Sequence, residues 1–550
     1  MTGQGGRPHR SQEFRVIALT TTASACFRLL DRLTRELPAV EVVGIVYARP
    51  PGPEFGDITT AGHRLLRRIR QALIEAGDVI LRALHASRGR HVGAGDMDPD
   101  TLGRACRERG WALLMNADLQ AAETLTFVRE VRADLGLALG LPVVPPALCE
   151  LPRLSCISVQ PSLGGESPGQ TELGLGTTPD VPSQIGVTVL RLGDTVHTSA
   201  VLRRATLDVQ PYDTRVSLGL KAAVVGDDLV VETVRDLLSG PAIGTPHDRT
   251  TVASADSPRV ASPSARPPDQ RPRRYRAPRG RPAWKLLVRS TLYAWYLPAR
   301  NWQRRLRKRF PIVILYHHLI SDRPHPMGIP TEAFLAHLLY LKRHYRVLSL
   351  SEAVTLLESG QVAEPTVVLT LDDGYADNFL NLRAALRMEP TPVTFFVCSD
   401  LILHGGRFPV DVAEGRHDFR PLTPDELCVL AAEGIEIGSH TRTHFDCGTS
   451  DVERLRSEII GSGEDLAKIL GRPVNRFSFP MGRRDNVSPE AAQIARACYA
   501  RYCSADGGLN WPGHDDRDLR RIPHPAGLWE LDLALQGVLG FTSRLGAPRG

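Results

Sequence analysis

The stretch that most constrains the fold is the run of β-branched and aliphatic residues at Thr366–Leu371, which leads directly into Asp372 and Asp373. A continuous apolar run predicts a strand that is buried on both faces, as in the parallel sheets of α/β proteins. The two carboxylates then fall at the carboxyl end of the strand, where barrels and open α/β sheets build their sites. Adjacent buried carboxylates repel each other and lose solvation, and a bound cation is the simplest compensation.

The alternative for the two aspartates is helix capping, because Asp before an apolar helix beginning near Tyr375 would cap that helix without doing chemistry. A second pattern further along the chain favours the metal. There, residues 435–439 predict another short strand, which ends in the pair His440 and His444. In a helical turn, positions i and i+4 share a face, so both imidazoles can reach one ion. One carboxylate and two imidazoles leave coordination positions open, as a catalytic zinc site requires.

Strand-like and helix-like runs alternate from residue 310 to residue 550, which predicts a barrel-like parallel α/β domain. The predicted strands are 311–318, 345–350, 366–371, 393–397, 435–439, 476–479, 499–504 and one near 522. The predicted helices are 332–343, 351–358, 376–388, 424–433, 452–470 and 488–498.

Three motifs of this half occur in order, each after a strand-like run. They are Thr-Leu-Asp-Asp-Gly-Tyr (370–375), Ser-His-Thr-Arg-Thr-His (439–444) and Phe-Ser-Phe-Pro-Met-Gly (477–482). Together they resemble the successive motifs of the polysaccharide deacetylase family, the NodB-like carbohydrate esterases. The resemblance covers roughly residues 310–530 and implies an irregular (β/α) barrel with seven strands.

The resemblance also implies roles for individual residues. Asp373, His440 and His444 would hold a divalent ion, with zinc as the first choice and cobalt or nickel as alternatives, and Asp372 would be the general base. A metal of this kind lowers the pKa of water from about 15.7 to about 7, which is roughly 12 kcal/mol of stabilisation of hydroxide. That shift makes amide hydrolysis feasible near neutral pH.

For the substrate, the resemblance implies four further residues. The backbone N–H of Met481 would help to hold the developing oxyanion. Tyr375 and Phe479 would line the sugar groove, and Trp511 is a weaker candidate for the same role.

Two positions depart from the family pattern. The third motif often carries an arginine that steadies the catalytic aspartate, but this chain has Ser478 there, so the ion pair is missing or comes from Arg476 or Arg483. The late Leu-x-His motif, whose histidine protonates the leaving amine, has its nearest match in His524. A histidine flanked by prolines could equally lie in a surface loop, and His317 is the second candidate for this acid.

Residues 14–242 are predicted to form a separate, doubly wound α/β domain. Strand-like runs at 14–20 and 40–47 flank a predicted helix at 24–36, and a β-α-β start predicts a parallel sheet. No Gly-x-Gly-x-x-Gly follows the first strand, so a dinucleotide site is not indicated.

Three landmarks in this domain, at 157–163, 186–189 and 213–214, resemble the formyl-tetrahydrofolate-dependent N-formyltransferases, such as methionyl-tRNA formyltransferase. Where that family has its catalytic Asn and His, this chain has Ser158 and Gln160. Where the family has an Asp before Thr-Gly, this chain has His197.

These substitutions bear on activity, because glutamine cannot act as a general acid or base, a role worth about 10²- to 10⁴-fold in rate. We therefore expect the N-terminal domain to have lost formyl transfer and to serve binding or scaffolding. A purely architectural remnant is the alternative, and the sequence leaves open whether folate still binds.

Residues 243–309 are predicted to be a linker. Pro, Ser and Arg dominate its first part, which is typical of a flexible, partly extended tether. Its second part, 284–309, combines Trp284, Trp295 and Trp302 with a dense block of Arg and Lys. Such a segment suits an anionic membrane surface, where each basic residue contributes about 1 kcal/mol. The alternatives are packing against the second domain, a nucleic-acid patch or a solvated basic tail.

Length and composition limit the number of domains and the class of protein. A chain of 550 residues exceeds one typical core, so two or more domains are expected. Nine cysteines without a C-x-x-C pair argue against a disulfide framework. The polar N-terminus lacks the apolar core of a signal peptide, and no apolar run approaches the ~18–20 residues of a membrane span. These features predict a cytoplasmic protein, and contact with the inner membrane face follows only if 284–309 binds a membrane surface. No RNA-recognition fingerprint accompanies the arginines, so a nucleic-acid partner is not expected.

The sequence therefore predicts that residues 310–550 form a metal-dependent hydrolase. Its substrate would be an N-acetylated amino sugar, free or in a lipid-linked or oligosaccharide precursor. One alternative is a deformylase of an N-formyl amino sugar, since a formyl-binding ancestor would pair naturally with a deacylase. The other is a non-catalytic carbohydrate-binding or scaffold protein, because the arginine of the third motif is absent and the acid is not evident.

Overall fold

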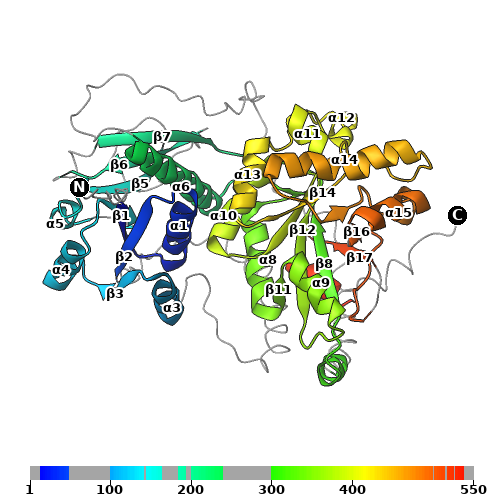
Figure 1. The fold of residues 1–550 in the computed structure, drawn as a ribbon, viewed down its shortest axis with the longest axis horizontal. Helices are drawn as coiled ribbons and strands as arrows, with labels where there is room; N and C mark the ends of the chain where they lie inside the picture. Colours follow the sequence, from blue (N-terminus) through cyan, green and yellow to red (C-terminus); the bar gives the residue numbers. More distant parts are fainter. Residues whose placement is uncertain are drawn as a thin grey trace, which may run out of the picture. The chain divides into compact units, whose positions relative to one another are not determined.

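The computed structural model describes residues 13–48, 99–141, 144–163, 184–193, 200–239, 299–499, 501–513, 517–525 and 527–537. These residues fall into two compact units (Figure 1). The N-terminal unit contains the described residues up to 239, and the C-terminal unit contains those from 299 onward. The predicted linker, 243–309, lies outside the described residues up to 298, so its limits stay a prediction.

The N-terminal unit is built on a seven-stranded sheet in the order β3-β2-β1-β4-β5-β6-β7. Strands β1 to β5 pair in parallel, whereas β5, β6 and β7 pair antiparallel. The strands are β1 (Phe14–Thr20), β2 (Val40–Ala48), β3 (Ala112–Ala117), β4 (Leu135–Leu139), β5 (Cys156–Leu163), β6 (Gln184–Arg191) and β7 (Ala200–Asp208). The helices are α1 (Ala23–Glu36), α3 (Pro99–Arg109), α4 (Ala122–Glu130), α5 (Pro146–Cys149) and α6 (Arg215–Ser239).

The hydrophobic run of β1 explains its central place in this sheet. Ile17 and Leu19 are buried in one cluster with Val43 and Val46 of β2, and helix α1 forms the connection between the two strands. The predicted doubly wound α/β fold of this unit is therefore confirmed.

The C-terminal unit is a closed parallel barrel. β8 pairs with β17 on one side and with β12 on the other, so the sheet β12-β13-β14-β15-β16-β17-β8 closes into a ring. The short strand β11 pairs with the first half of β12, and β13 pairs with its second half. The predicted irregular (β/α) barrel is confirmed.

The strands of this unit are β8 (Ile312–His317), β9 (Leu319–Ile320), β10 (Gly328–Ile329), β11 (Arg346–Leu348), β12 (Thr366–Leu371), β13 (Val393–Val397), β14 (Glu436–Ser439), β15 (Phe477–Ser478), β16 (Tyr502–Ser504) and β17 (Asp518–Pro523). The helices around the ring are α8 (Thr331–His344), α9 (Leu350–Glu358), α10 (Asp377–Met388), α11 (Ser399–His404), α12 (Pro409–Ala413), α13 (Pro424–Ala432), α14 (Val452–Leu470), α15 (Pro489–Cys498) and α16 (Leu528–Leu535), with the 3₁₀ turn η2 (Arg484–Asn486).

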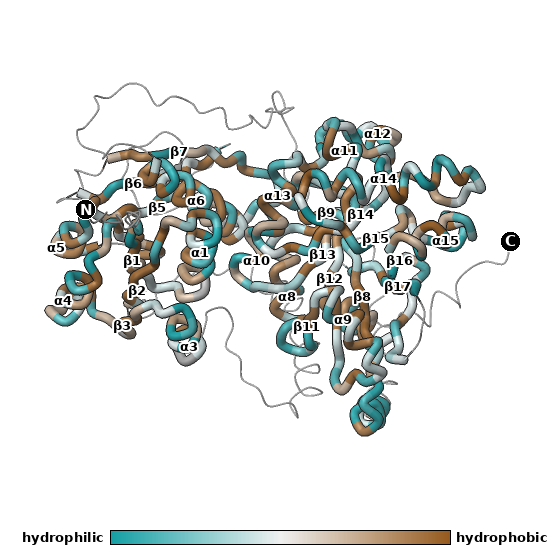
Figure 2. The backbone as a smooth tube through the Cα atoms, viewed as in Figure 1, coloured by the Kyte–Doolittle hydropathy of each residue, from teal (hydrophilic) through white to brown (hydrophobic). Residues whose placement is uncertain are grey.

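Local sequence explains these elements well. Every residue of β12 is buried, as its unbroken apolar run predicts, because ring and helices cover both faces. Helix α14 is amphipathic, and Figure 2 shows hydrophobic and hydrophilic residues alternating along it. Its start is capped by Asp451, whose side chain accepts the N–H of Arg454, and it ends at Gly471 in the left-handed conformation.

A short helix at 299–306 precedes β8 at the amino end of the barrel. Arg300 donates to the carbonyl of Gln536 at 2.8 Å, and the guanidinium of Arg304 lies over the ring of Trp511 at 5.0 Å. Two residues of the helix, Trp302 and Leu306, remain about two-thirds exposed. No helix among the described residues is long and apolar enough to cross a membrane.

Candidate active site

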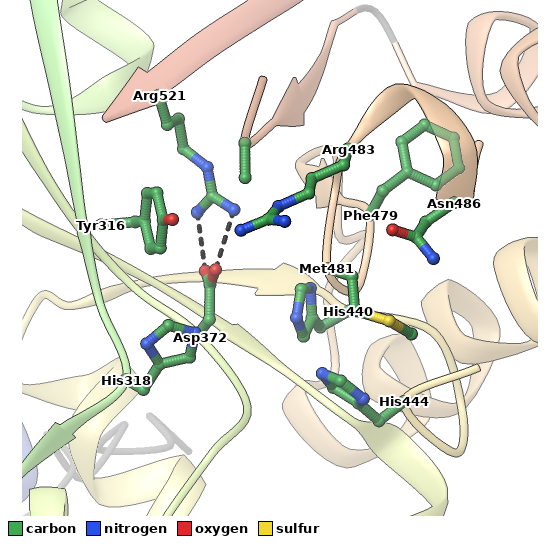
Figure 3. A pocket seen from close by; sticks show the side chains of 11 residues that line it. Tyr316, His318, Asp372, His440, His444, Phe479, Met481, Arg483, Asn486 and Arg521 are labelled. Atoms are coloured by element: carbon green, nitrogen blue, oxygen red, sulfur yellow. Dashed lines mark hydrogen bonds and ion pairs between the residues drawn. The ribbon is translucent and has the colours of Figure 1, made fainter. Parts of the chain in front are cut away.

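The carboxyl ends of the barrel strands surround a pocket of about 280 Å³. Side chains that follow β8, β12, β14, β15 and β16, or end β17, converge on it (Figure 3). The lining residues are Tyr316, His318, Asp372, His440, His444, Phe479, Met481, Arg483, Asn486, Ala505 and Arg521.

Three possible metal ligands meet beside this pocket. Ligand atoms of Asp373, His440 and His444 all lie within 4.8 Å of one another. The Oδ1 atom of Asp373 is 3.5 Å from Nε2 of His440 and 3.3 Å from Nε2 of His444. This oxygen is buried and has no hydrogen-bond partner among the described residues. A buried carboxylate oxygen left unsatisfied between two imidazoles is a suitable donor set for a divalent cation.

A backbone carbonyl fixes the orientation of His440. The Nδ1 atom of His440 lies 2.8 Å from the carbonyl oxygen of Ser478, on the neighbouring strand β15. Because a carbonyl can only accept, Nδ1 carries the hydrogen, and Nε2 keeps its lone pair facing Asp373. This is the arrangement that orients and tunes a metal-binding histidine.

The turn that carries the two histidines is not helical, so the predicted helical turn is wrong. Thr441 and His444 have left-handed φ values of 61° and 59°. The buried carboxylate of Glu458, from helix α14, accepts the backbone N–H groups of Arg442 at 2.9 Å and Thr443 at 3.0 Å. A side chain distant in sequence thus supplies the hydrogen bonds that a helix would have supplied, and the histidines converge through a fixed loop.

The charges at the cluster reinforce one another. Burial alone would raise the pKa of the Asp373 carboxyl, but its contacts with His440 and His444 outweigh burial and hold that pKa well below its usual range. Burial lowers the pKa of His444, whereas Asp373 raises it, and the net effect is an increase. Asp373 is therefore held as a carboxylate.

Asp372 is bound on both oxygens by one arginine. Arg521 of β17 donates from Nη1 to Oδ1 at 2.7 Å and from Nη2 to Oδ2 at 2.8 Å, and both residues are buried. The same guanidinium donates to the hydroxyls of Thr370 and Ser478. The capping alternative is wrong, because helix α10 begins at Asp377 and its N-cap residue is Ala376.

The ion pair expected for the catalytic aspartate is therefore present, but its source was not predicted. Arg476 is bonded to Glu436 at 3.1 Å, away from Asp372. Arg483 lines the pocket without a hydrogen bond to Asp372. Ser478, which stands where the family often has an arginine, accepts a hydrogen bond from Arg521 at 2.6 Å.

Of the four residues predicted to contact the substrate, two line the pocket and two do not. Phe479 and Met481 line the pocket, but Tyr375 and Trp511 do not. Tyr375 is fully buried and donates to Asp411 at 2.8 Å, because Gly374, with φ of 100°, turns the chain away from the barrel mouth. Trp511 lies beside β16 and β17 in a different, smaller cavity.

The two candidates for the acid also lie elsewhere. Along β8, side chains alternate, so Tyr316 and His318 face the pocket while His317 faces helix α8. His524 is partly buried beside His317, with Nε2 at 2.6 Å from Nδ1 of His337. Burial, together with the neighbouring histidines, holds the pKa values of His317 and His524 well below the ordinary value.

The pocket histidine outside the metal cluster is thus His318, which sequence reasoning missed by one position. Its ring lies 5.5 Å from that of Tyr316. The alternation rule for strands would have found it, because a pocket-facing Tyr316 implies a pocket-facing His318.

In the N-terminal unit, Ser158 and Gln160 lie on β5, where they pair with Leu190 and Thr188 of β6. Their spacing of two places both side chains on the same face of the sheet. The third substituted position, His197, lies outside the described residues.

Comparisons with known proteins find different relatives for the two halves of the chain. Residues 359–501 match the family described as polysaccharide deacetylase. The protein named "Putative polysaccharide deacetylase YxkH" from Bacillus subtilis (strain 168) is 26% identical over 183 residues, which cover 33% of this chain and 60% of the relative. Methionyl-tRNA formyltransferase from Synechococcus sp. (strain JA-3-3Ab) is 30% identical over 138 residues, which cover 24% of this chain and 41% of that protein.

A solved structure, the Streptococcus pyogenes deacetylase PplD in complex with acetate, aligns with a TM-score of 0.34 at 20% identity and covers 42% of this chain and 98% of its own. The chain spans about half the length of the curated relatives it matches. Residues 359–501 form a polysaccharide deacetylase domain, and the N-terminal half of the chain is formyltransferase-like.

Proposed function

We propose that the C-terminal unit is a metal-dependent hydrolase that removes the acetyl group from an N-acetylated amino sugar. The observation that carries the proposal is the convergence of Asp373, His440 and His444 beside the buried pair of Asp372 and Arg521. These residues would hold zinc, or cobalt or nickel in its place. When bound, such an ion activates water and polarises the acyl oxygen.

Asp372 is the general base of this proposal. Its carboxylate lines the pocket and takes the proton of the attacking water. The bidentate guanidinium of Arg521 fixes the plane of the carboxylate. Both oxygens retain further lone pairs, so the ion pair leaves Asp372 able to accept a proton.

His318 is the proposed general acid, in place of His524 or His317. It lines the pocket on the β8 side, whereas the ring of His440 lies on the β14 side. Asn378 holds it in place by donating to the carbonyl of His318 at 2.9 Å. A proton delivered there to the leaving nitrogen completes hydrolysis of the amide.

Met481 supplies a donor for the developing oxyanion. Its backbone has a left-handed φ of 58°, and no acceptor for its N–H is found among the described residues. A preorganised N–H of this kind stabilises negative charge that appears in the transition state. Phe479 provides an apolar wall for the acyl group or sugar ring.

The direct test is amine release from N-acetylhexosamine oligomers, with the protein loaded with zinc or cobalt. We expect turnover that is lost in Asp373→Asn and Asp372→Asn. If the wild-type protein loaded with either metal releases no amine from N-acetyl or N-formyl sugars, the enzyme proposal fails and a carbohydrate-binding or scaffold role remains.

A deformylase is the second candidate, favoured by the formyltransferase-like unit on the same chain. It differs only in the acyl group that the pocket accepts. N-formyl and N-acetyl versions of the same hexosamine, compared by kcat/KM, decide between the two.

The N-terminal unit is proposed to be non-catalytic. Ser158 and Gln160 cannot act as general acid or base, and they occupy the positions at which the formyltransferases have Asn and His. Titration with formyl-tetrahydrofolate tests whether the unit still binds folate although the catalytic residues are substituted. Tight binding would contradict an architectural remnant, and formyl transfer to an amine would overturn the proposal.

Contact with an anionic membrane is proposed for the segment 284–309, of which 299–309 is described. Trp302 and Leu306 are four residues apart on one helical face and are 65% and 66% exposed. Arg305, Arg307 and Lys308 are exposed beside them. Flotation with phosphatidylserine vesicles should be lost when Trp302 and Leu306 are replaced by serine. Equal flotation of variant and wild type would remove the membrane proposal.

A further inference from the structure

The pocket carries a positive charge that the reaction described above does not use. Its lining includes two guanidinium groups, Arg483 and Arg521, but only one carboxylate, Asp372. Arg521 makes a bidentate ion pair with Asp372. In the part of the chain that the structure describes, the guanidinium of Arg483 has no hydrogen-bond or ion-pair partner. Arg483 therefore faces the pocket without a counter-charge.

The backbone beneath Arg483 is held in place. The N–H of Asn486 donates to the carbonyl of Arg483 at 2.9 Å, and the N–H of Ala505 donates to the carbonyl of Gly482 at 2.8 Å. The side chain of Asn486 donates to Asp446 at 2.8 Å, which ties this loop to the loop that follows β14. Because the loop is fixed on both sides of Arg483, only its side chain has to be ordered when a ligand binds.

The direction of the side chain agrees with a role in binding. Figure 3 shows the guanidinium of Arg483 directed toward the interior of the pocket, on the side of Asp372 and His440. Its neighbour Arg484 is different, because it is exposed, does not line the pocket and pairs with Asp506 at 3.4 Å. The two adjacent arginines thus offer a matched pair, one inside the pocket and one outside it.

We propose that Arg483 binds an anionic group of the substrate, so that the preferred sugar carries a phosphate or a carboxylate near its N-acyl group. The inference rests on the proposed deacylase function, and it narrows the substrate class. A planar guanidinium binds both anions with two parallel hydrogen bonds, and such charge-assisted bonds are about twice as strong as neutral ones. Neutral N-acetyl sugars would reach the same catalytic groups without this contact.

The test compares three N-acetylated sugars that differ in the presence and position of an anionic group: the methyl glycoside of N-acetylglucosamine, N-acetylglucosamine 1-phosphate and the corresponding N-acetylated uronic acid. We expect at least one charged sugar to have the higher kcat/KM, and which one it is identifies the anion. Arg483→Gln should lower kcat/KM for that sugar by about 10- to 100-fold and change the neutral glycoside by less than about 3-fold. Arg484→Gln should change neither.

Other outcomes overturn the inference. If the wild-type protein does not prefer a charged sugar, or if Arg483→Gln lowers kcat/KM for all three sugars equally, Arg483 is not an anion site. If no sugar is turned over, the deacylase proposal fails. The anion-binding role of Arg483 is then tested separately, by binding measurements. Calorimetric titration with N-acetylglucosamine 1-phosphate should then show binding that is at least about 10-fold weaker in Arg483→Gln, and equal binding would overturn the proposal.

Discussion

Arg521 and Asp372 form a buried bidentate ion pair at 2.7 and 2.8 Å, although they lie 149 residues apart in the chain. β8 lies between β17, which carries Arg521, and β12, which precedes Asp372, and it pairs with both strands to close the ring. The pair therefore depends on closure of the barrel. In this chain the guanidinium that steadies the proposed base comes from β17, and Ser478 of the third motif serves as one of its acceptors.

Removal of Arg521 should lower the stability of the fold. We expect Arg521→Met to lower the free energy of unfolding by about 3–5 kcal/mol, because it leaves Asp372 without a counter-charge. The double variant Asp372→Asn, Arg521→Met should recover part of this loss, since no unpaired charge remains. Urea denaturation of the wild type, Asp372→Asn, Arg521→Met and the double variant measures the coupling free energy between the two residues. Arg472→Gln, which changes an exposed arginine, is the control. Strictly additive losses would contradict the pairing.

Metal binding should be stoichiometric and should depend on Asp373. We expect about one zinc per chain by elemental analysis, and a melting temperature that rises with added zinc and falls with a chelator. A ligand present at 100 times its Kd stabilises a fold by about 2.7 kcal/mol. Asp373→Asn should remove both the zinc and the zinc-dependent shift in melting temperature. A zinc-dependent shift of unchanged size in the variant would place the ion elsewhere.

Glu458 should act as a positioning residue for the histidine loop. Glu458→Gln keeps the shape of the side chain but removes its negative charge, so the hydrogen bonds that Oε2 accepts from the N–H groups of Arg442 and Thr443 become weaker. We expect zinc affinity to fall by about 10- to 100-fold, the usual effect of losing such support. Glu453→Gln, at an exposed position of the same helix, is the matched control. Competition with a chromogenic chelator gives both affinities, and equal values would contradict the role.

The acid can be identified by comparing two histidines. His318→Asn should lower kcat by about 10²- to 10⁴-fold while leaving zinc content unchanged, because His318 lines the pocket outside the proposed ligand set. His524→Asn should lower stability rather than kcat, because His524 contacts His317 and His337 and does not line the pocket. The opposite result, with kcat lost only in the His524 variant, would return the acid role to His524.

The adjacent histidines His317 and His524 should make the fold sensitive to acid. Burial holds both folded pKa values well below the unfolded value of about 6.5. Above pH 6.5 both states are neutral and stability is complete. Below it, only the unfolded chain takes up these protons, so stability falls by up to about 1.4 kcal/mol per pH unit for each group.

Urea denaturation between pH 5 and pH 8 checks this sensitivity. His524→Gln should lose less stability on acidification than the wild type, because it removes one of the two groups. The control His417→Gln changes an exposed histidine and should follow the wild-type curve. Parallel curves for all three proteins would contradict the assignment.

The sequence predicts the elements of the barrel where the signals are local. Residues 452–470 form helix α14 with the predicted bounds, because Asp451 caps its start and Gly471 ends it in the left-handed conformation. The buried strand β12 has its predicted bounds because it is an unbroken run of β-branched and aliphatic residues. The short helices α11 and α12 were not predicted, since they are only six and five residues long and have no sustained period.

The site residues that were predicted wrongly share one physical cause. Contacts with distant parts of the chain decide the direction in which their side chains point. Nothing near Arg521 in the sequence indicates that its guanidinium meets Asp372. The histidine turn is not helical because Glu458, from a distant part of the chain, replaces the helical hydrogen bonds. Tyr375 turns away from the mouth to reach Asp411, which belongs to the unpredicted helix α12.

The helix at 299–306 leads into the first residue of β8, whereas the pocket opens where β8 ends. Contact of Trp302 and Leu306 with a bilayer would therefore leave the mouth of the barrel facing the aqueous side. A protein docked in this way would act on sugars that extend well clear of the lipid, and a short head group lying at the bilayer surface would be out of its reach.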